Sequence, residues 1–145
     1  MIKTFFTSDK ELFAKARTIR EKVFIEEQKV DERDEFDEFE DLSKHYLIFD
    51  DEKAVGTARW RHIGDKIKLE RFAVLEEYRS KGFGDQILRA ILEEVLTFKK
   101  PIYLHAQLRA IPFYERGGLK KVGEMFSECD IDHYKMVIEN LESRT

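Results

Sequence analysis

A glycine-bearing turn that runs into an amphipathic segment is the stretch of this sequence best suited to binding an anion. The turn is Arg79-Ser80-Lys81-Gly82-Phe83-Gly84, and from Asp85 onward apolar residues recur at helical spacing. The first N–H groups of a helix have no internal acceptor, and glycine has no side chain to block a ligand that approaches them. Arg79 and Lys81 place positive charge beside the turn. We therefore predict a phosphate site here.

Nucleophilic and metal chemistry have weaker support. Cys129 is the only cysteine, which excludes an intramolecular disulfide and a structural zinc site built on several thiolates. His133 follows it four residues later, but no third group is evident that would orient the pair for nucleophilic catalysis. The acidic stretch 26–41 lacks the Asp-x-Asp-x-Asp-Gly pattern of a calcium loop. We expect no metal site.

Strands and helices on both sides of the turn must position it. The pattern predicts strands at 2–6, 45–49, 54–61, 66–74, 102–106, 120–126 and 131–138, and helices at 9–24, 85–96 and 110–118. Strand 66–74 ends in an apolar run, as a central strand covered on both faces does, and it delivers the chain to the turn. Strand, turn, helix and strand over 66–106 form a right-handed βαβ unit, so the two strands are predicted to be parallel.

The first helix and the acidic stretch after it are predicted to border the same region. Ser8-Asp9-Lys10-Glu11 is a capping box that starts the helix near Asp9. Its apolar stripe is Leu12, Phe13, Ala16, Ile19, Val23 and Phe24, with Lys15, Arg17, Arg20 and Lys22 on the solvent side. Ten of the sixteen residues in 26–41 are Asp or Glu, which is typical of a solvated loop. Because Phe36 and Phe39 interrupt the run at helical spacing, we expect part of it to pack as a short helix.

Composition indicates one domain over residues 1–145. The chain has 42% hydrophobic residues and twelve phenylalanines, enough for a core of its own. No window reaches the ~18 apolar residues of a membrane span, and no secretory leader is recognisable, so a cytoplasmic location without membrane association is expected. A net charge of −4 argues against a nucleic-acid partner and suits an amine-bearing one.

The order of elements and motifs resembles the GNAT superfamily of acyl-coenzyme A-dependent N-acyltransferases over nearly the whole chain. The matching residues are Phe72-Ala73-Val74, Tyr78-Arg79-Ser80-Lys81-Gly82-Phe83-Gly84 and Gln107-x-x-Ala110-x-x-Phe113-Tyr114-Glu115-x-x-Gly118-Leu119. Residues 20–28 and the motif Gly123-Glu124-x-Phe126-x-Glu128-x-x-Ile131-x-His133 look like the ElaA-type branch. The resemblance implies an α+β domain of α/β three-layer form, with a mixed, mainly antiparallel sheet, helices on both faces and a splayed parallel strand pair.

The resemblance also implies a donor site for acetyl-coenzyme A as co-substrate. The turn from Arg79 through Ser80, Lys81, Gly82, Phe83 and Gly84 to Asp85 would hold the pyrophosphate. The pantetheine arm would lie between the strand ends at Phe72-Ala73-Val74 and 104–106 and pair like an added strand, close to Gln107 and Tyr114. Two positions depart from the common pattern: Gln107 stands where many members have asparagine, and Ser80 where glycine is common. The serine costs little if its φ is negative.

The implied reaction is direct acetyl transfer to a primary amine in a ternary complex. Tyr114 matches the tyrosine that donates a proton or hydrogen bond to the departing thiolate, and strand N–H groups near Val74 would stabilise the oxyanion. An amine is mostly protonated at neutral pH, so a base is needed. Glu70, which shares a strand face with Phe72 and Val74, and His133 are the candidates. Glu70 could equally be a solvent-facing residue paired with Arg71 or Lys68, and His45 and His105 have only their strand positions in support.

The acceptor side is the less defined half of the prediction. In this superfamily the segment after the first helix borders the acceptor, so Glu27, Asp34, Asp37 and Asp41, together with His133, would bind a polyamine, an aminoglycoside or a lysine-bearing substrate. A monomer or homodimer is expected. A non-catalytic acyl-coenzyme A-binding or regulatory domain would keep the phosphate turn without the acceptor chemistry. A P-loop-like nucleotide enzyme is disfavoured because no Gly-Lys-Ser/Thr is present.

Overall fold

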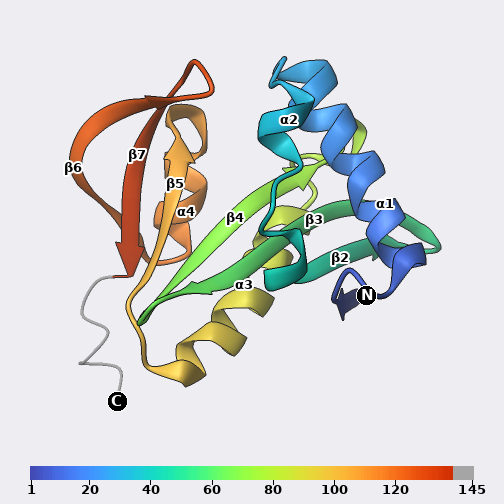
Figure 1. Ribbon diagram of the computed structural model, residues 1–145, viewed down its shortest axis with the longest axis horizontal. Helices are drawn as coiled ribbons and strands as arrows, with labels where there is room; N and C mark the ends of the chain where they lie inside the picture. Colours follow the sequence, from blue (N-terminus) through green and yellow to red (C-terminus); the bar gives the residue numbers. More distant parts are fainter. Residues whose placement is uncertain (139–145) are drawn as a thin grey trace.

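A seven-stranded sheet in the order β1-β2-β3-β4-β5-β7-β6 forms the middle layer of the computed structural model, in which residues 1–138 are described (Figure 1). Its strands are β1 (Ile2–Phe5), β2 (Lys44–Asp50), β3 (Lys53–Ile63), β4 (Lys66–Val74), β5 (Ile102–Gln107), β6 (Leu119–Glu128) and β7 (Ile131–Ile138). Only β4 and β5 run parallel, and every other neighbouring pair is antiparallel. The predicted mixed, mainly antiparallel sheet with one parallel pair is confirmed.

Helices cover both faces of the sheet, as predicted. α1 (Lys10–Arg20) and the one-turn α2 (Glu32–Glu35) lie on one face, while α3 (Phe83–Val95) and α4 (Ile111–Arg116) lie on the other (Figure 1). Period-two alternation in the strands supplies both layers of core. In β2, Ile48 packs into the cluster that contains α3, and its neighbour Leu47 packs into the cluster that contains α1. None of the helices in residues 1–138 is long and apolar enough to cross a bilayer.

α3 follows the sequence pattern closely. Its five apolar residues at helical spacing are all buried, namely Ile87, Leu88, Ile91, Leu92 and Val95. Gly82 is the N-cap, with φ of +89°, a conformation that glycine adopts without a steric penalty. The strand–turn–helix–strand unit therefore places the start of α3 beside the end of β4.

α1 differs from the prediction at both ends. The cap is Asp9, whose carboxylate accepts from the Leu12 amide at 3.1 Å, and Ser8 makes no such bond. An aspartate one residue later satisfies the same kind of orphan amide, which moves the helix start to Lys10. Beyond Arg20 the chain continues as a π-helical segment, Glu21–Glu27, rather than as the α-helix predicted through Phe24.

The two C-terminal strands are arranged in a way that their order in the chain does not reveal. β7 lies between β5 and β6, antiparallel to both, and Gln107 at the end of β5 pairs in register with His133. The turn between β6 and β7 contains Cys129 and Asp130, with φ of +52° and +60°. As a result, the start of β7 and the end of β6 stand beside the C-terminal end of β5.

Candidate active site

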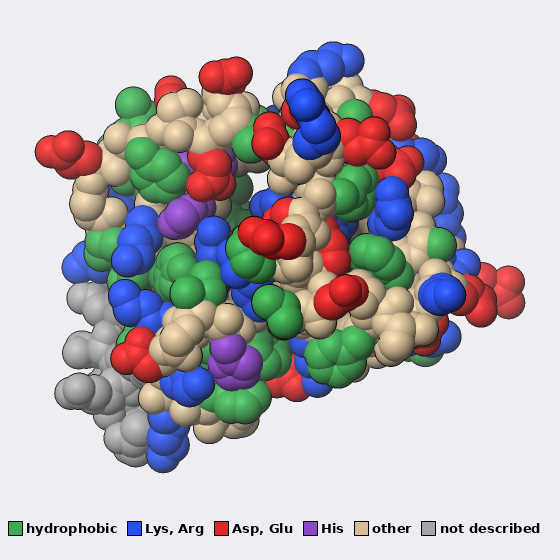
Figure 2. Space-filling model, in the orientation of Figure 1, with side chains coloured by type: hydrophobic (Ala, Val, Ile, Leu, Met, Phe, Trp, Pro, Cys, Tyr) green, Lys and Arg blue, Asp and Glu red, His purple; other side chains and the backbone are tan. Residues whose placement is uncertain are grey.

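A cavity of about 410 Å³ opens where β4 and β5 separate. Among the site residues identified from the sequence, those that line it are Asp34, Glu70, Phe72, Ala73, Val74, Arg79, His105, Gln107, Tyr114 and His133. Figure 2 shows this face hollowed between the side that carries β5, β6 and β7 and the side that carries α1 and α2. The structure thus brings together the residues predicted from three separate motifs.

The separation of β4 from β5 creates the cavity. Their parallel pairing covers only Ile67 to Leu69 opposite Ile102 to Leu104, so neither Glu70 to Val74 nor His105 to Gln107 pairs across the gap. The register of β4 against β3 also shifts at this level, and Arg71 adopts φ of +61°. The backbone edges on the two sides of the gap are left without a strand partner, which is the condition for an extended ligand to pair with them.

The predicted phosphate turn lies at the open end of this gap. A Cβ placed on Gly84 would come within 3.2 Å of Phe113 Cε1 and 3.8 Å of Val74 Cγ2, so the helix start is held close to both α4 and β4. Arg79 braces the turn by donating from Nε to the Val74 carbonyl at 2.9 Å and from Nη2 to Glu27 at 2.9 Å. The N–H groups of the first turn of α3 are therefore next to the end of the splayed strand.

Ser80 does not have the negative φ at which serine could replace glycine at little cost. Its φ is +64°, in the left-handed region, where a residue with a Cβ is strained. The sequence did contain a signal for this positive φ, because glycine is common at this position in the family that the chain resembles. Ser80 and Lys81 are exposed, the Phe83 ring packs against the core, and the Asp85 carboxylate lies 3.7 Å from Arg116.

Tyr114 projects from α4 into the apolar wall of the cavity. Its ring contacts Phe72, with centroids 5.5 Å apart, and Phe113, with centroids 4.9 Å apart. Its hydroxyl has no hydrogen-bond partner in residues 1–138. Because every fully buried polar side-chain atom in these residues has a partner, this hydroxyl is not fully buried. Burial raises the pKa of Tyr114 well above its ordinary value of 10.0, so the phenol stays protonated. The Tyr114 hydroxyl is therefore able to donate a hydrogen bond to a ligand.

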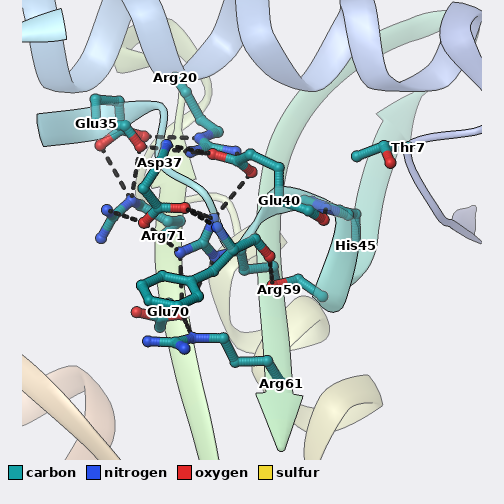
Figure 3. Close-up of polar contacts among 12 residues, drawn as sticks. Thr7, Arg20, Glu35, Asp37, Glu40, His45, Arg59, Arg61, Glu70 and Arg71 are labelled. Atoms are coloured by element: carbon teal, nitrogen blue, oxygen red, sulfur yellow. Dashed lines mark hydrogen bonds and ion pairs between the residues drawn. The ribbon is translucent and has the colours of Figure 1, made fainter. Parts of the chain in front are cut away.

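The sequence left two roles open for Glu70, a general base or a solvent-facing glutamate paired with Arg71 or Lys68, and the structure shows it in a tighter environment than either. It is buried, and it pairs with Arg59 at 3.1 Å, Arg61 at 2.7 Å and Lys68 at 3.3 Å, but not with Arg71 (Figure 3). Burial alone would raise the pKa of this carboxyl. Arg59, Arg61 and Lys68 together outweigh burial and lower the pKa of Glu70 to about 2. A carboxylate held in this way is a weak base.

Three carboxylates of the acidic stretch, Glu35, Asp37 and Glu40, belong to a largely buried network of ion pairs. Arg20 binds Glu35 at 2.7 Å and Glu40 at 2.8 Å, and Arg59 binds Glu40 at 2.9 Å and Asp37 at 2.9 Å (Figure 3). Assigning Arg20 to the solvent side of the first helix was wrong, because only 1% of its surface is exposed. Its position four residues after Ala16 and four before Phe24 was the signal that it faces inward.

Three of the predicted acceptor-binding carboxylates already have side-chain partners, and two of those partners, Arg71 and Arg79, line the cavity. Asp37 is shared between Arg59 and Arg71, Glu27 binds Arg79, and Asp41 accepts from Thr7. In residues 1–138 none of these three carboxylates lines the cavity, whereas Asp34 and Glu35 do. The two phenylalanines of the acidic stretch pack against the body but lie outside a helix. The guanidinium groups of Arg17 and Arg20 lie over the Phe36 ring, and that of Arg61 lies over the Phe39 ring.

His133 and Gln107 occupy the wall opposite β4. His133 is buried and stacks on Phe126, and its Nδ1 lies 2.6 Å from the Ile131 carbonyl, to which it must donate. Gln107 donates from Nε2 to Gln28 Oε1 at 2.8 Å, which links β5 to the π-helical segment. His45 is placed elsewhere: it stacks on Phe5 and bonds the Glu40 carbonyl at 3.0 Å, outside the lining of the cavity.

A pair that sequence reasoning did not connect, His105 and Glu128, also lines the cavity. The Nδ1 atom of His105 lies 3.0 Å from Oε2 of Glu128. The residues are 23 positions apart in the chain and meet only because β7 separates their strands by one position in the sheet. Glu128 lies within the motif that resembles the ElaA-type branch, which was the one signal available.

Comparison with known proteins supports the arrangement. A sequence model described as an acetyltransferase (GNAT) domain matches residues 9–140. The chain is 36% identical over 138 residues to the uncharacterized N-acetyltransferase YjcF of Bacillus subtilis, covering 94% of this chain and 99% of that protein. It is similar to the crystal structure of Escherichia coli ElaA (TM-score 0.84, 27% identity, 96% and 99% of the two chains) and of an acyl-CoA N-acyltransferase from Pseudomonas aeruginosa (0.80, 26%, 94% and 98%).

Proposed function

This chain belongs to the GNAT family of acetyltransferases, in its ElaA-like branch, and we propose that it transfers an acetyl group from acetyl-coenzyme A to a primary amine of a small molecule or peptide. One observation carries the proposal. The unpaired gap between β4 and β5 leads from the N-terminus of α3 to a tyrosine hydroxyl that has no partner in residues 1–138. A donor with an anionic head, an extended arm and a reactive thioester fits that sequence of features.

The residues of the donor side fit coenzyme A. The N–H groups from Ser80 to Gly84 and the positive end of the α3 dipole would hold the pyrophosphate, with Arg79 keeping the turn against Val74. The edge of β4 from Phe72 to Val74 would bind the amide-bearing arm as a strand binds a strand. Both are interactions with backbone groups, so they need no particular side chain in the turn or in the strand.

Tyr114 would assist departure of the thiolate by donating a hydrogen bond. A phenol with a pKa above 10.0 holds its proton more tightly than a thiol of pKa about 8.5 does, so complete proton transfer from Tyr114 is uphill. A hydrogen bond from a neutral donor in an apolar pocket still stabilises the charge that develops on sulfur. A strand N–H near Val74 would stabilise the oxyanion, and the amine would attack directly while both substrates are bound.

Removal of a proton from the acceptor ammonium is better assigned to an imidazole than to Glu70. Glu70 has all its interactions in the arginine and lysine cluster, and its pKa of about 2 makes it a poor acceptor. Its three cations would instead keep it fixed as part of the cavity floor. Of the two bases favoured from the sequence, Glu70 and His133, the histidine is the one with an available lone pair, because its Nδ1 donates to a carbonyl and its Nε2 has no partner in residues 1–138.

The test is a thiol-release assay with purified protein, acetyl-coenzyme A and a panel of amines: spermidine, kanamycin and a lysine-containing peptide. We expect thermal stabilisation by acetyl-coenzyme A, by about 2.7 kcal/mol at 100 times the dissociation constant, and thiol release that depends on one class of amine. Stabilisation without amine-dependent release would indicate a non-catalytic acyl-coenzyme A-binding domain. No stabilisation by acetyl-coenzyme A would refute the proposal. The cytoplasmic location and the monomeric or dimeric state stay predictions.

A further inference from the structure

His105 is the first residue of β5 beyond the point where pairing with β4 ends. The last paired residues are Leu69 and Leu104, so the register places His105 opposite Glu70 at the closed end of the gap. A donor anchored at the α3 turn beside Val74 extends along β4 toward this closed end. The reactive thioester, at the far end of the arm from the pyrophosphate, is thereby directed toward His105 rather than away from it.

The chemistry of its partner defines the tautomer of His105. A carboxylate only accepts hydrogen bonds, so the contact of 3.0 Å with Glu128 requires a proton on Nδ1 of the imidazole. In the neutral ring the lone pair is then on Nε2, which has no partner in the described part of the chain. The Phe126 ring meets the imidazole edge-on, with centroids 4.9 Å apart, and steadies its plane. His105 hence presents an oriented base in the cavity lining.

Glu128 gives His105 an advantage over His133. The hydrogen bond from His105, the largest influence on this carboxyl, lowers the pKa of Glu128, so the carboxylate is ionised at neutral pH. An imidazolium formed at His105 therefore has a counter-charge in contact with it. His133 donates to a neutral carbonyl instead, and it is buried, whereas His105 is half-buried.

Other charged and titratable groups surround the pair. On β4 these are Lys68 and the Glu70 carboxylate that it pairs with. On β5 the neighbour is Tyr103, and on β7 the neighbours are Lys135 and His133. Lys135 pairs in register with His105, but its ammonium lies over the Tyr103 ring at 5.1 Å. Glu128 is thus the anion that contacts the ring of His105, while the neighbouring strands carry both cations and the paired carboxylate of Glu70.

We propose that His105 is the general base of the acetyl transfer and that Glu128 is the residue that positions it. This assignment rests on the proposed function. Nε2 of His105 takes one proton from the acceptor ammonium, and the freed lone pair forms a C–N bond with the acyl carbon. The C–S bond then breaks with its electron pair going to sulfur. The acceptor nitrogen's second proton goes to the thiolate, and His105 releases the first to solvent, which balances the reaction.

The test compares His105→Gln and Glu128→Gln with matched controls in the thiol-release assay, using acetyl-coenzyme A and the panel amine that reacts fastest. We expect His105→Gln to lower kcat on the order of 10² to 10⁴-fold and to remove the acidic limb of the pH–rate profile. Glu128→Gln should lower kcat less and move that limb to lower pH, because the imidazolium has lost its counter-charge. His62→Gln, at an exposed histidine outside the cavity lining, and Glu124→Gln, on the same strand as Glu128, should change neither.

Two further variants separate a base from a structural residue. Free imidazole in the buffer should restore part of the activity of His105→Ala but none of that of Tyr114→Phe. His133→Gln should retain the acidic limb. A pH profile that survives in His105→Gln and disappears in His133→Gln would overturn this assignment and leave the proposed function intact. A wild-type protein that binds acetyl-coenzyme A but acetylates no amine in the panel would contradict the proposed function itself, and the base with it.

Discussion

Arg20 Nε in α1 lies 2.7 Å from Glu35 Oε1 in α2, with both side chains almost completely buried. This ion pair anchors the acidic stretch against the first helix, and Glu40 and Asp37 extend it to Arg59 and Arg71. The wall of the cavity opposite β5 is therefore held by charge pairs in the interior. A stretch rich in carboxylates has become a structural element because the arginines that neutralise it come from α1, β3 and β4.

Removal of Arg20 should destabilise the fold severely. Arg20→Ala would leave Glu35 and Glu40 buried without their partner, and we expect a loss of about 3–5 kcal/mol in the free energy of unfolding. Urea unfolding followed by tryptophan fluorescence measures it. Lys15→Ala, at an exposed position of the same helix, should cost less than about 0.5 kcal/mol. Equal effects of the two substitutions would show that the network contributes nothing specific.

Acid should remove the stability that ionised Glu70 contributes. Its folded pKa of about 2 lies below its ordinary value of 4.5, so the contribution is present above pH 4.5 and is lost as the pH falls toward 2. The loss should be about 3 kcal/mol over that window. Glu70→Gln should have lower stability at neutral pH but a flatter dependence between pH 4.5 and 2. Glu77→Gln, at an exposed position, should follow the wild type, and a Glu70→Gln curve parallel to it would contradict the assignment.

The turn before α3 should respond to glycine substitutions according to its backbone. Gly82→Ala places a Cβ at φ of +89°, which should cost about 1–2 kcal/mol of stability and weaken acetyl-coenzyme A binding. Gly64→Ala, at φ of +59° in an open turn between β3 and β4, should cost a similar amount with no change in binding. Thermal unfolding with and without acetyl-coenzyme A distinguishes them. Unchanged binding in both variants would argue against the phosphate site.

Ser80→Gly should be tolerated for the complementary reason. The residue already has φ of +64°, so glycine relieves strain while adding flexibility to the unfolded chain. We expect a change in the free energy of unfolding within about 1 kcal/mol and acetyl-coenzyme A affinity at least equal to that of the wild type. Differential scanning fluorimetry and a binding titration check both. A large loss of affinity would show that the serine side chain takes part in binding.

Tyr114→Phe should lower the catalytic rate and leave the fold intact. The substitution keeps the ring that packs on Phe72 and Phe113 and removes only the unpartnered hydroxyl. Loss of a hydrogen bond to a developing charge corresponds to about a 10² to 10³-fold decrease in kcat. Steady-state rates at saturating acetyl-coenzyme A measure it, and Tyr134→Phe, at a half-buried position in β7, serves as the control. An unchanged kcat would refute the role of Tyr114.

Local features of the chain were predictable because their physical causes are local. The helical spacing from Ile87 to Val95, the glycines of the turn and the alternation in the strands depend on neighbours along the sequence, and the structure confirms the elements that they predict. The parallel pair of β4 and β5 also followed, since a strand, helix and strand of that length close in one way. These features are the ones that indicate the family and the proposed donor side.

The acceptor side was decided by tertiary structure, since its defining contacts join residues far apart in the chain. Asp37 and Asp41 have the same character in the sequence, and only the fold shows that arginine and threonine partners occupy them. His105 was one histidine among four until β7, inserted between β5 and β6, brought Glu128 to its ring. Charge pairing acts through space and has no period along the chain. The sequence by itself therefore determined the family, the parallel strand pair and the turn proposed to bind the donor, and the three-dimensional arrangement decided which groups line the cavity proposed for the acceptor.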